Sequence, residues 1–394
     1  MGCTMPDSLV KEALASAKKE GEGVPPQAAV PGEAGTSQAD EEIRRIAEKL
    51  SVSIKIIGCG GGGCNTINRC VDAGISGAQL CAINTDAKHL LTIRAPSKIL
   101  IGRASTRGLG AGAIPEVGEQ AAMENGPEIK QFLNGANIVF VTSGMGGGTG
   151  TGSAHYVARI AKDQIQALTI GVVTMPFKAE GTLRMENALA GLKKLSWVCD
   201  TTIVVMNDKL LELVPKLPVE AAFKVADEVL MMTIKGLTEI ITKPGLVNLD
   251  YSDIQTIMNE GGMAFVGLGE SDDAKERVDE AVNEALHSPL LGDIDLKGSK
   301  GALVRVIGGP DMTIMEAQKA AEIVGKNIHP SARIIWGCSI EQELKGTIKV
   351  LAIFTGAKSP FMGGRGEEAG PAKLGQEARQ GPAASGKGAS SNWD

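Results

Sequence analysis

Aromatic residues are scarce in this chain of 394 residues, since Phe, Tyr and Trp together make up only 3% of it. A folded core must therefore be built from aliphatic side chains, and hydrophobic residues overall still make up 43% of the sequence. Sustained runs of Lys and Arg are also missing, and the formal net charge is −6. This charge balance argues against nucleic acid as the main partner, because nucleic-acid-binding surfaces are strongly basic.

The cysteine pattern and the lack of long apolar segments argue against secreted and membrane-spanning proteins. The seven cysteines are odd in number and irregularly spaced, whereas a disulfide framework normally has an even number of cysteines. Cys59, Cys64 and Cys70 lie close together but match no common zinc spacing, so we interpret them as apolar fillers, with a metal site as the alternative. No segment resembles a signal peptide. We expect a cytoplasmic chain with no direct membrane insertion.

Composition divides the chain into five parts. Both ends are rich in Ala, Gly, Glu and Lys without a steady apolar period, which predicts disorder. A Pro at position 218 is well placed to open a long helix, because its fixed φ suits a first helical turn. The expected parts are a disordered arm at 1–37, an α/β domain at 38–217 with an amphipathic helix at 39–50, a central helix at 218–243, an α+β domain at 244–357 and a disordered tail at 358–394.

Apolar runs alternate with helical patterns through the middle of the chain, as expected of a parallel sheet covered by helices. Strands are predicted at 53–57, 79–83, 99–101, 138–142, 167–174, 201–206, 263–268, 302–307, 332–336 and 347–354. Besides the central helix, helices are predicted at 65–71, 153–162, 272–286 and 313–327. The sequence thus predicts an α/β fold with a mixed second part.

The stretch GMGGGTGTG at 144–152 is the most informative motif, because a strand-like segment precedes it and a helix-like segment follows. Glycines let backbone N–H groups converge on an anion at a helix N-terminus, where the helix dipole also favours negative charge. Thr149 and Thr151 add hydroxyl donors. No Lys follows, so this is not the common GxxxxGK[ST] phosphate loop. We interpret the motif as a phosphate cradle rather than a flexible linker, since linkers are rarely so short.

Two more glycine clusters, at 58–63 and 107–112, and the segment Asn84-Thr85-Asp86 also follow predicted strands. The carboxyl ends of parallel strands meet at one rim, which is where open α/β sheets bind ligands. Each cluster alone suits a tight turn, and the first alone resembles a dinucleotide fingerprint, which leaves a Rossmann-type oxidoreductase as an alternative. Together the clusters favour a nucleotide site.

These motifs together resemble the tubulin-like cell-division GTPase family FtsZ. The segments that carry the resemblance are GCGGGGCN at 58–65, INTD at 83–86, TRGLGAG at 106–112, GMGGGTGTG at 144–152 and KPGLVNLDYSD at 243–253. Their order and spacing match across about 54–355, and the segments GESD at 269–272 and IIWGCSI at 334–340 resemble archaeal members. The resemblance implies a tubulin/FtsZ-like fold, with a Rossmann-like parallel-sheet GTPase domain, a long central helix and a smaller α+β domain.

The resemblance implies GTP and GDP as the nucleotides, with Mg²⁺ as the ion that phosphoryl chemistry requires. It places Glu180 at the ribose hydroxyls, Arg184 near the phosphates and guanine, and Asn207 at the guanine and ribose. Asp86 also belongs to the nucleotide site. The residues implied to contact the phosphates are Gly61, Gly62, Asn65, Gly110, Ala111, Gly112, Gly146, Gly147, Gly148, Thr149 and Gly150.

Two residues of the central helix are implied to recognise the base. Phe223 would stack on guanine, and Asp227 would pair with the hydrogens on N1 and N2. A carboxylate that accepts from two guanine donors distinguishes guanine from adenine, whose edge has a different pattern. Without the resemblance, the residues themselves favour a core phenylalanine and a solvated aspartate.

The acidic segment around Asn248, Asp250 and Asp253 is implied to be catalytic. These acids could simply occupy the first turn of a helix, where carboxylates suit the dipole. Yet hydrolysis needs a group that orients water or takes its proton, and the glycine loops supply none. In the family this segment reaches the GTP of the next subunit, so that a head-to-tail homopolymer completes each active site.

Some positions depart from the family pattern. His155-Tyr156 replaces a more usual Pro-Val, and Thr182-Leu183 replaces a frequent basic pair, both near the expected nucleotide or polymer face. The tail lacks the apolar-basic peptide of bacterial relatives, although it still suggests membrane-anchoring or division-regulating partners. The expected location is the mid-cell division site. A tubulin-like structural or regulatory paralogue without a role in division is the second alternative.

Overall fold

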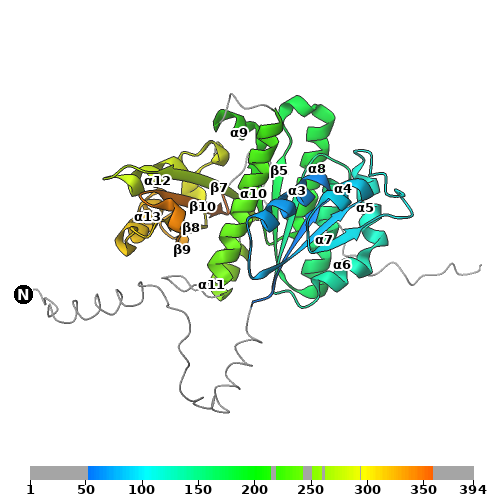
Figure 1. Cartoon of the computed structure of the whole chain (residues 1–394), viewed down its shortest axis with the longest axis horizontal. Coiled ribbons are helices and arrows are strands. Elements are labelled where there is room, and N and C mark those ends of the chain that lie inside the picture. The colour runs from blue at the N-terminus through cyan, green and yellow to red at the C-terminus, as the bar shows by residue number, and fades with distance from the viewer. Residues whose placement is uncertain (1–51, 214–218, 243–250, 260–261, 293, 358–394) are drawn as a thin grey trace, which may run out of the picture. The chain divides into compact units, whose positions relative to one another are not determined.

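The computed structural model describes residues 52–213, 219–242, 251–259, 262–292 and 294–357 (Figure 1). The predicted helix at 39–50, the arm at 1–37 and the tail at 358–394 lie outside the described residues. Every element described below belongs to the unit formed by residues 52–394.

A ten-stranded sheet runs through the described residues in the order β3-β2-β1-β4-β5-β6-β7-β10-β8-β9. All strands from β3 to β7 in this order are parallel, whereas β10 is antiparallel to both β7 and β8. Strand β9 is parallel to β8. The strands are β1 (Ile54–Cys59), β2 (Ala78–Asn84), β3 (Ser97–Leu100), β4 (Ile138–Gly144), β5 (Leu168–Met175), β6 (Thr201–Met206), β7 (Gly262–Ser271), β8 (Gly301–Gly308), β9 (Arg333–Ile340) and β10 (Ile348–Thr355).

Helices cover both faces of the parallel part, which explains why its strands are almost continuously apolar. Successive β1 side chains alternate between two cores: Ile54 and Ile56 pack with α3 and α10, while Ile57 and Cys59 pack with α5 to α8. The helices are α3 (Gly60–Asp72), α4 (Ala87–Thr92), α5 (Pro115–Glu124), α6 (Gly126–Leu133), α7 (Thr149–Arg159), α8 (Thr182–Val198), α9 (Asn207–Leu213), α10 (Val219–Thr242), α11 (Tyr251–Asn259), α12 (Arg277–Leu286) and α13 (Ile314–Asn327), with short 3₁₀ or π segments at 160–165, 178–180, 289–291, 296–298 and 342–344.

The predicted α/β fold is confirmed, and the structure adds that the second part continues the same sheet. Strand β7 joins β6 through three parallel pairs, from Thr201 with Gly262 to Ile203 with Ala264. Helix α10 spans 24 residues, about 36 Å at 1.5 Å per residue. Its Glu239 carboxylate accepts a hydrogen bond from buried Arg305 of β8, whose guanidinium also donates to the Gly236 carbonyl at 3.1 Å. The predicted domain boundaries stay predictions.

Three helix starts differ from those predicted. Helix α7 begins at Thr149 rather than at residue 153, so the end of the motif at 144–152 already belongs to the helix. The first glycine cluster was expected to be a loop up to Asn65, but α3 begins at Gly60. Here glycine allows close packing rather than a loop, because a Cβ at Gly63 would lie 2.4 Å from the Thr142 carbonyl oxygen. Helix α12 begins at Arg277 instead of residue 272, since the Asp273 carboxylate accepts N–H donors of the preceding turn.

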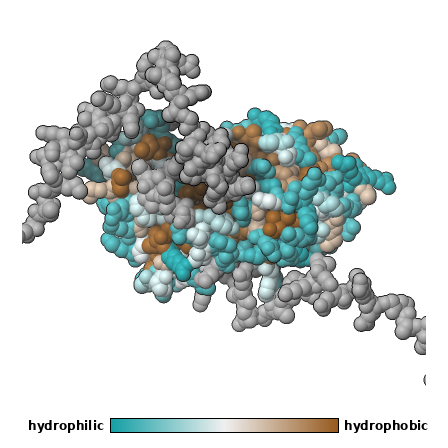
Figure 2. All heavy atoms as spheres, turned by 90° about the horizontal axis from the view of Figure 1, so that it is seen from below, coloured by the Kyte–Doolittle hydropathy of each residue, from teal (hydrophilic) through white to brown (hydrophobic). Residues whose placement is uncertain are grey.

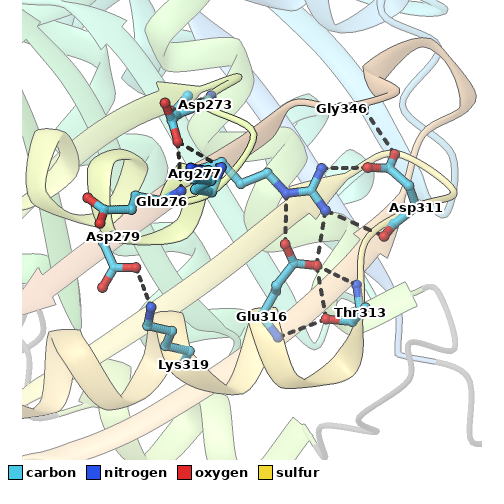
Figure 3. A network of polar contacts seen from close by, with 11 residues as sticks. Asp273, Glu276, Arg277, Asp279, Asp311, Thr313, Glu316, Lys319 and Gly346 are labelled. Carbon is cyan, nitrogen blue, oxygen red and sulfur yellow. Dashed lines mark hydrogen bonds and ion pairs between the residues drawn. The ribbon is translucent and has the colours of Figure 1, made fainter.

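A polar network joins α12 to α13 (Figure 3). The Arg277 guanidinium lies between the carboxylates of Asp311 and Glu316, with 2.7 Å between Nε and the Glu316 Oε1. Glu316 also closes a capping box with Thr313, which begins α13. The capping box is the reason that α13 starts where the sequence predicts, within one residue.

Candidate functional site

Two glycine clusters meet by backbone contact at the carboxyl ends of β1 and β4. Gly60 has φ +69°, and a Cβ there would lie 2.6 Å from the Gly150 nitrogen. A Cβ at Gly62 would lie 3.2 Å from the Gly144 Cα, and one at Gly150 would lie 2.4 Å from the Ser143 hydroxyl. A Cβ at Gly60 or Gly150 would overlap backbone atoms, so the two loops pack closely side by side.

The loop from β4 to α7 folds back on itself through a hydroxyl. The Gly146 N–H donates to Thr151 Oγ1 at 2.8 Å, and Gly146 has φ +99°. Thr151 is buried, so its hydroxyl holds the loop shape rather than pointing outward as a further donor. Gly148 forms the N-cap of α7 without a side-chain cap, which leaves the first N–H groups of the helix for a ligand.

The third glycine cluster is tied to the same place through β2. The Gly110 N–H donates to the Thr85 carbonyl at 3.2 Å, and Thr85 Oγ1 lies 2.6 Å from Thr149 Oγ1 at the start of α7. Ala111 is buried, and a Cβ at Gly148 would lie 2.9 Å from its methyl group. Thus the three predicted loops converge at one end of the sheet, which we call the glycine-loop end.

Four glycines of these loops have open space beside them. A Cβ built at any of four glycines would meet no atom within 4 Å, and these are Gly61, Gly110, Gly112 and Gly147. The surrounding glycines are packed tightly while these four face outward. Such a shape is a cradle of backbone groups with room for an anion.

Asn65 and Asp86 lie beside the cradle but bond within the protein. The Asn65 Oδ1 lies 3.1 Å from His89 Nε2, and His89 Nδ1 lies 3.1 Å from Asn84 Nδ2. Asp86 caps α4 by accepting the His89 N–H at 3.0 Å. The structure therefore shows Asp86 ordering this end of β2.

Glu180 and Arg184 form an ion pair on the far side of the cradle. Arg184 Nε lies 3.0 Å from Glu180 Oε2, and the Glu180 Oε1 accepts the Phe177 N–H at 2.8 Å. The Arg184 stem runs along Gly146, where a Cβ would lie 2.7 Å from Arg184 Cγ. The Arg184 side chain is 51% exposed, so its guanidinium can turn toward a bound anion.

An apolar pair and an unpartnered amide lie on the side of α10. The rings of Phe177 and Phe223 meet edge to face, with centroids 5.0 Å apart, and Phe223 is 40% exposed. Asn207 begins α9 and is buried, yet its Oδ1 has no hydrogen-bond partner among the described residues. Because buried acceptors are normally satisfied, this oxygen indicates a missing donor such as a ligand hydroxyl or N–H.

Asp227 lies one helical turn beyond Phe223, next to α3. Its side chain is 18% exposed, and its Oδ2 lies 4.0 Å from Arg69 Nε. Burial raises the pKa of Asp227 to about 7, with Arg69 opposing the shift and Glu228 adding to it. The solvated aspartate considered from the sequence is therefore wrong: this carboxyl is largely buried.

Helix α11, which carries Asp253, lies at the opposite end of the sheet. Asn248 and Asp250 fall outside the described residues, and Asp253 lies on α11. The Tyr251 hydroxyl at the start of α11 donates to the Asn137 carbonyl at 3.2 Å, immediately before β4. The glycine loops follow the other end of β4. Because β4 is a strand of seven residues, its two ends lie about 20 Å apart. Figure 1 shows α11 at the lower end of the strands.

Comparison with known proteins decides the family. The Tubulin/FtsZ family GTPase domain matches residues 53–215, and the FtsZ family C-terminal domain matches residues 262–358. Cell division protein FtsZ 1 of Archaeoglobus fulgidus is 52% identical over 91% of this chain and 95% of its own length. This chain belongs to the FtsZ family.

Two further relatives agree with an archaeal FtsZ. The cell division protein FtsZ of Haloferax mediterranei is 50% identical, and the match covers 92% of this chain and 96% of that protein. The solved structure described as an empty FtsZ dimer from M. jannaschii has a TM-score of 0.77 at 49% identity, covering 81% of this chain and 92% of that one. The FtsZ resemblance is confirmed, and the oxidoreductase alternative is wrong.

Membership in the FtsZ family makes this chain a tubulin-like GTPase of the cell-division type, with GTP and GDP as its nucleotides. No described helix of this FtsZ is long and apolar enough to cross a bilayer. Figure 2, which looks at the molecule from the α11 side, shows separate hydrophobic patches among hydrophilic ones.

The sequence alone did not indicate a role for three residues at this FtsZ site, which are Thr85, Phe177 and Arg69. Thr85 was seen only as part of a strand end, although its hydroxyl links β2 to α7. Phe177 and Arg69 come from segments far from α10 in the chain, and no local pattern predicts their contacts with Phe223 and Asp227. Only the meeting of α3, α10 and the segment after β5 reveals them.

His155, which differs from the usual family residue at this position, packs between two helices. His155 on α7 is buried, and its Nε2 lies 3.0 Å from Glu119 Oε1 on α5. Burial lowers the pKa of His155 against the opposing effect of Glu119, so the imidazole is neutral at pH 7 and Nε2–H donates. Leu183, by contrast, is 69% exposed beside Arg184.

Proposed function

We propose that this FtsZ-family chain binds GTP at the glycine-loop end, polymerises head to tail and hydrolyses GTP at each subunit junction. One observation carries the proposal: α11, which contains Asp253 and directly follows Asp250, begins at the other end of the sheet. Asp253 on α11 therefore lies too far from the cradle of its own subunit to reach the nucleotide there. A head-to-tail contact would bring Asp253, and Asp250 three residues before it in the sequence, to the cradle of the next subunit, and repetition of such a contact builds a filament.

The binding roles are those that the FtsZ resemblance implies, and the geometry of the cradle supports them. Backbone N–H groups of Gly61, Gly62, Ala111, Gly112 and Gly147 to Gly150 hold the phosphates, with Asn65 and Thr149 beside them and Asp86 shaping the rim. Gly110 and Gly146, whose N–H groups bond within the loops, line the phosphate site without donating to it. Glu180, Arg184 and Asn207 hold the ribose and the base edge, and the free acceptor of Asn207 fits that role. Phe223 stacks on guanine, and Asp227 accepts from N1 and N2.

Mg²⁺ fits this site as an ion bound mainly by the nucleotide. The described residues contain no group of three or more His, Cys, Asp or Glu side chains that could hold a metal. Mg²⁺ commonly keeps several waters and binds phosphate oxygens with few protein ligands. When bound, it neutralises charge on the phosphates. The chain itself positions the phosphates, and Asn248, Asp250 and Asp253 of the neighbour orient the attacking water and accept its proton.

Exposed apolar side chains around the cradle support a protein partner there. Leu109 is 84% exposed, Leu183 is 69% exposed and Ile114 is 51% exposed, and each lies in or next to a loop of the site. Large apolar side chains gathered around a polar site are typical of surfaces that a partner covers. The FtsZ of M. jannaschii has been solved as a dimer, which supports self-association in this family.

GTP turnover per subunit is expected to rise steeply with protein concentration, because a lone subunit has no complete active site. Below the concentration at which filaments form, turnover should be close to zero. The measurement is phosphate release at saturating GTP over a wide range of protein concentrations, with light scattering in GTP and in GDP followed in parallel. Turnover per subunit that stays constant down to dilute monomer would contradict the shared site.

Affinity for guanine nucleotides is expected to fall about tenfold from pH 8 to pH 6. The Asp227 carboxyl, with its pKa near 7 before binding, must be ionised to accept two guanine hydrogens. Below pH 7 the Asp227 carboxyl of the free protein is mostly protonated and must lose this proton before guanine binds. The affinity therefore falls as the pH decreases. The measurement is the dissociation constant of GDP at several pH values.

Asp227→Asn is the control for this pH dependence. The amide keeps the shape of the carboxyl but replaces one acceptor by a donor, so affinity should drop about a hundredfold. The nucleotide phosphates titrate equally in both proteins, so the ratio of their affinities isolates residue 227. An unchanged pH slope in the variant would remove Asp227 from guanine recognition.

The same proposal places the filament at the mid-cell division site in the cytoplasm, with membrane-anchoring or division-regulating proteins bound through residues 358–394. A structural or regulatory paralogue would share the nucleotide site but not this location. A tagged chain that is absent from the division site in growing cells would favour the paralogue.

A further inference from the structure

A second polar site lies at the α11 end of the sheet, which we define by the strand ends opposite the glycine loops. The register places it there: Thr201 of β6 is level with Gly262 of β7, and Thr355 of β10 is level with both Ala264 and Gly301. Gly301 in turn is level with Arg333 at the start of β9. The first residues of β8 and β9 and the last of β10 therefore share one end with α11.

A pocket of about 370 Å³ opens at this end, between α11 and the starts of β8 and β9. Its polar lining includes Ser299, Lys300, His329, Ser331 and Arg333. No Asp or Glu of the described residues lines it, although the whole chain is acidic. A concave site that gathers cations and hydroxyls without any acid favours a negatively charged occupant.

The two cations in the pocket have no acidic partner among the described residues. Lys300 and Arg333 take part in no ion pair there, whereas Arg277 and Arg305 are both matched with carboxylates. Their backbones are fixed, because the Lys300 N–H donates to the Thr355 carbonyl at 2.9 Å and the Arg333 N–H donates to the Lys300 carbonyl at 3.2 Å. The pocket therefore holds two positive charges on adjacent strand ends that no described carboxylate neutralises.

Neutral donors complete the lining. Ser299 is fully buried, and its hydroxyl has no hydrogen-bond partner among the described residues. His329 Nδ1 accepts the Ser331 N–H at 3.2 Å, which leaves the ring proton on Nε2 when the imidazole is neutral. A buried hydroxyl without a partner is uncommon, and it indicates an occupant that can bond to it.

We propose that this pocket binds an oxyanion, either a carboxylate or a phosphate, through Lys300, Arg333 and the Ser299 hydroxyl. Charge-assisted hydrogen bonds from lysine and arginine suit both groups. Two sources present this chemistry: free inorganic phosphate, which GTP hydrolysis releases, and an acidic side chain of the next copy of this chain. The second source rests on the proposed head-to-tail filament, because the pocket lies at the end that would meet the neighbour.

The test compares two double variants that each lose two positive charges. Lys300→Gln with Arg333→Gln empties the pocket of cations, and Lys297→Gln with Lys326→Gln removes exposed lysines that do not line it. Circular dichroism melts establish that both are folded, and Arg333→Gln alone is used if the first double variant is not. The GDP-loaded proteins are titrated with inorganic phosphate and followed by ³¹P line broadening, and the GTP-loaded proteins are sedimented over a range of concentrations.

If the occupant is a free anion, the Lys300→Gln, Arg333→Gln variant should lose at least tenfold in phosphate affinity, and the Lys297→Gln, Lys326→Gln control should lose none. A neighbouring carboxylate predicts instead at least a tenfold higher concentration for sedimentation in the pocket variant, with GTP binding unchanged. Equal behaviour of the two double variants in both measurements overturns the proposal. If the unaltered protein fails to sediment with GTP at any concentration, the proposed filament is wrong, while the phosphate titration still decides whether the pocket binds an anion.

Discussion

Asp250→Ala is expected to lower GTP turnover by about 10²- to 10⁴-fold while leaving GTP binding unchanged. Asp250 directly precedes α11, whose first residue bonds at the strand end opposite the glycine loops. Its carboxylate is proposed to act on the nucleotide of the neighbouring subunit, so its loss removes the group that accepts the proton of the attacking water. The measurements are phosphate release at a concentration that supports assembly and GTP affinity by equilibrium binding.

Mixing experiments distinguish a shared site from an ordinary one. Asp227→Asn subunits bind GTP poorly but keep Asp250, while Asp250→Ala subunits keep the nucleotide pocket. Together they should recover part of the turnover that neither shows alone, because one supplies the nucleotide and the other the acid. Asp163→Ala, an exposed aspartate of the segment after α7, is the matched control and should turn over GTP normally. Normal turnover in Asp250→Ala would remove that residue from catalysis.

Arg305→Ala is expected to lower the free energy of unfolding by about 3–5 kcal/mol, a large fraction of the stability of an ordinary domain. The side chains of Arg305 and Glu239 are only 3% and 4% exposed. Truncation of Arg305 leaves the Glu239 carboxylate buried without its cationic partner. It also removes the donors to the Lys235 and Gly236 carbonyls, which fix α10 against β8. Urea unfolding followed by circular dichroism measures the loss.

A double variant and an exposed pair serve as controls for this ion pair. Arg305→Met with Glu239→Leu removes both charges and should regain most of the lost stability, since the main cost is an unpaired buried charge. Lys319→Ala breaks an ion pair with Asp279 whose side chains are 51% and 43% exposed, and should cost at most about 1 kcal/mol. Equal losses in Arg305→Ala and Lys319→Ala would show that burial of the pair is unimportant.

Much of the architecture was predictable because local patterns carry it. Strand β6 occupies the predicted range, and all described residues of α10, Val219–Thr242, fall within the helix predicted at 218–243. Helix α3 was placed five residues late, because glycine runs normally predict loops. Only the approach of its backbone to β4 explains why glycines form its first turns.

Local sequence motifs predicted the nucleotide chemistry. These motifs are three glycine clusters after apolar strands, and an acidic segment after Pro244-Gly245. What these motifs could not decide was which groups face each other. Three features depend on segments distant in the chain: the burial of Asp227 beside Arg69, the Asn207 oxygen, and the cations of Lys300 and Arg333. Neither the oxygen nor the two cations has a partner within the part of the chain that the structure describes. Local propensities act over a few residues, whereas pKa values, charge pairing and the separation of the cradle from α11 are set by packing across the whole sheet.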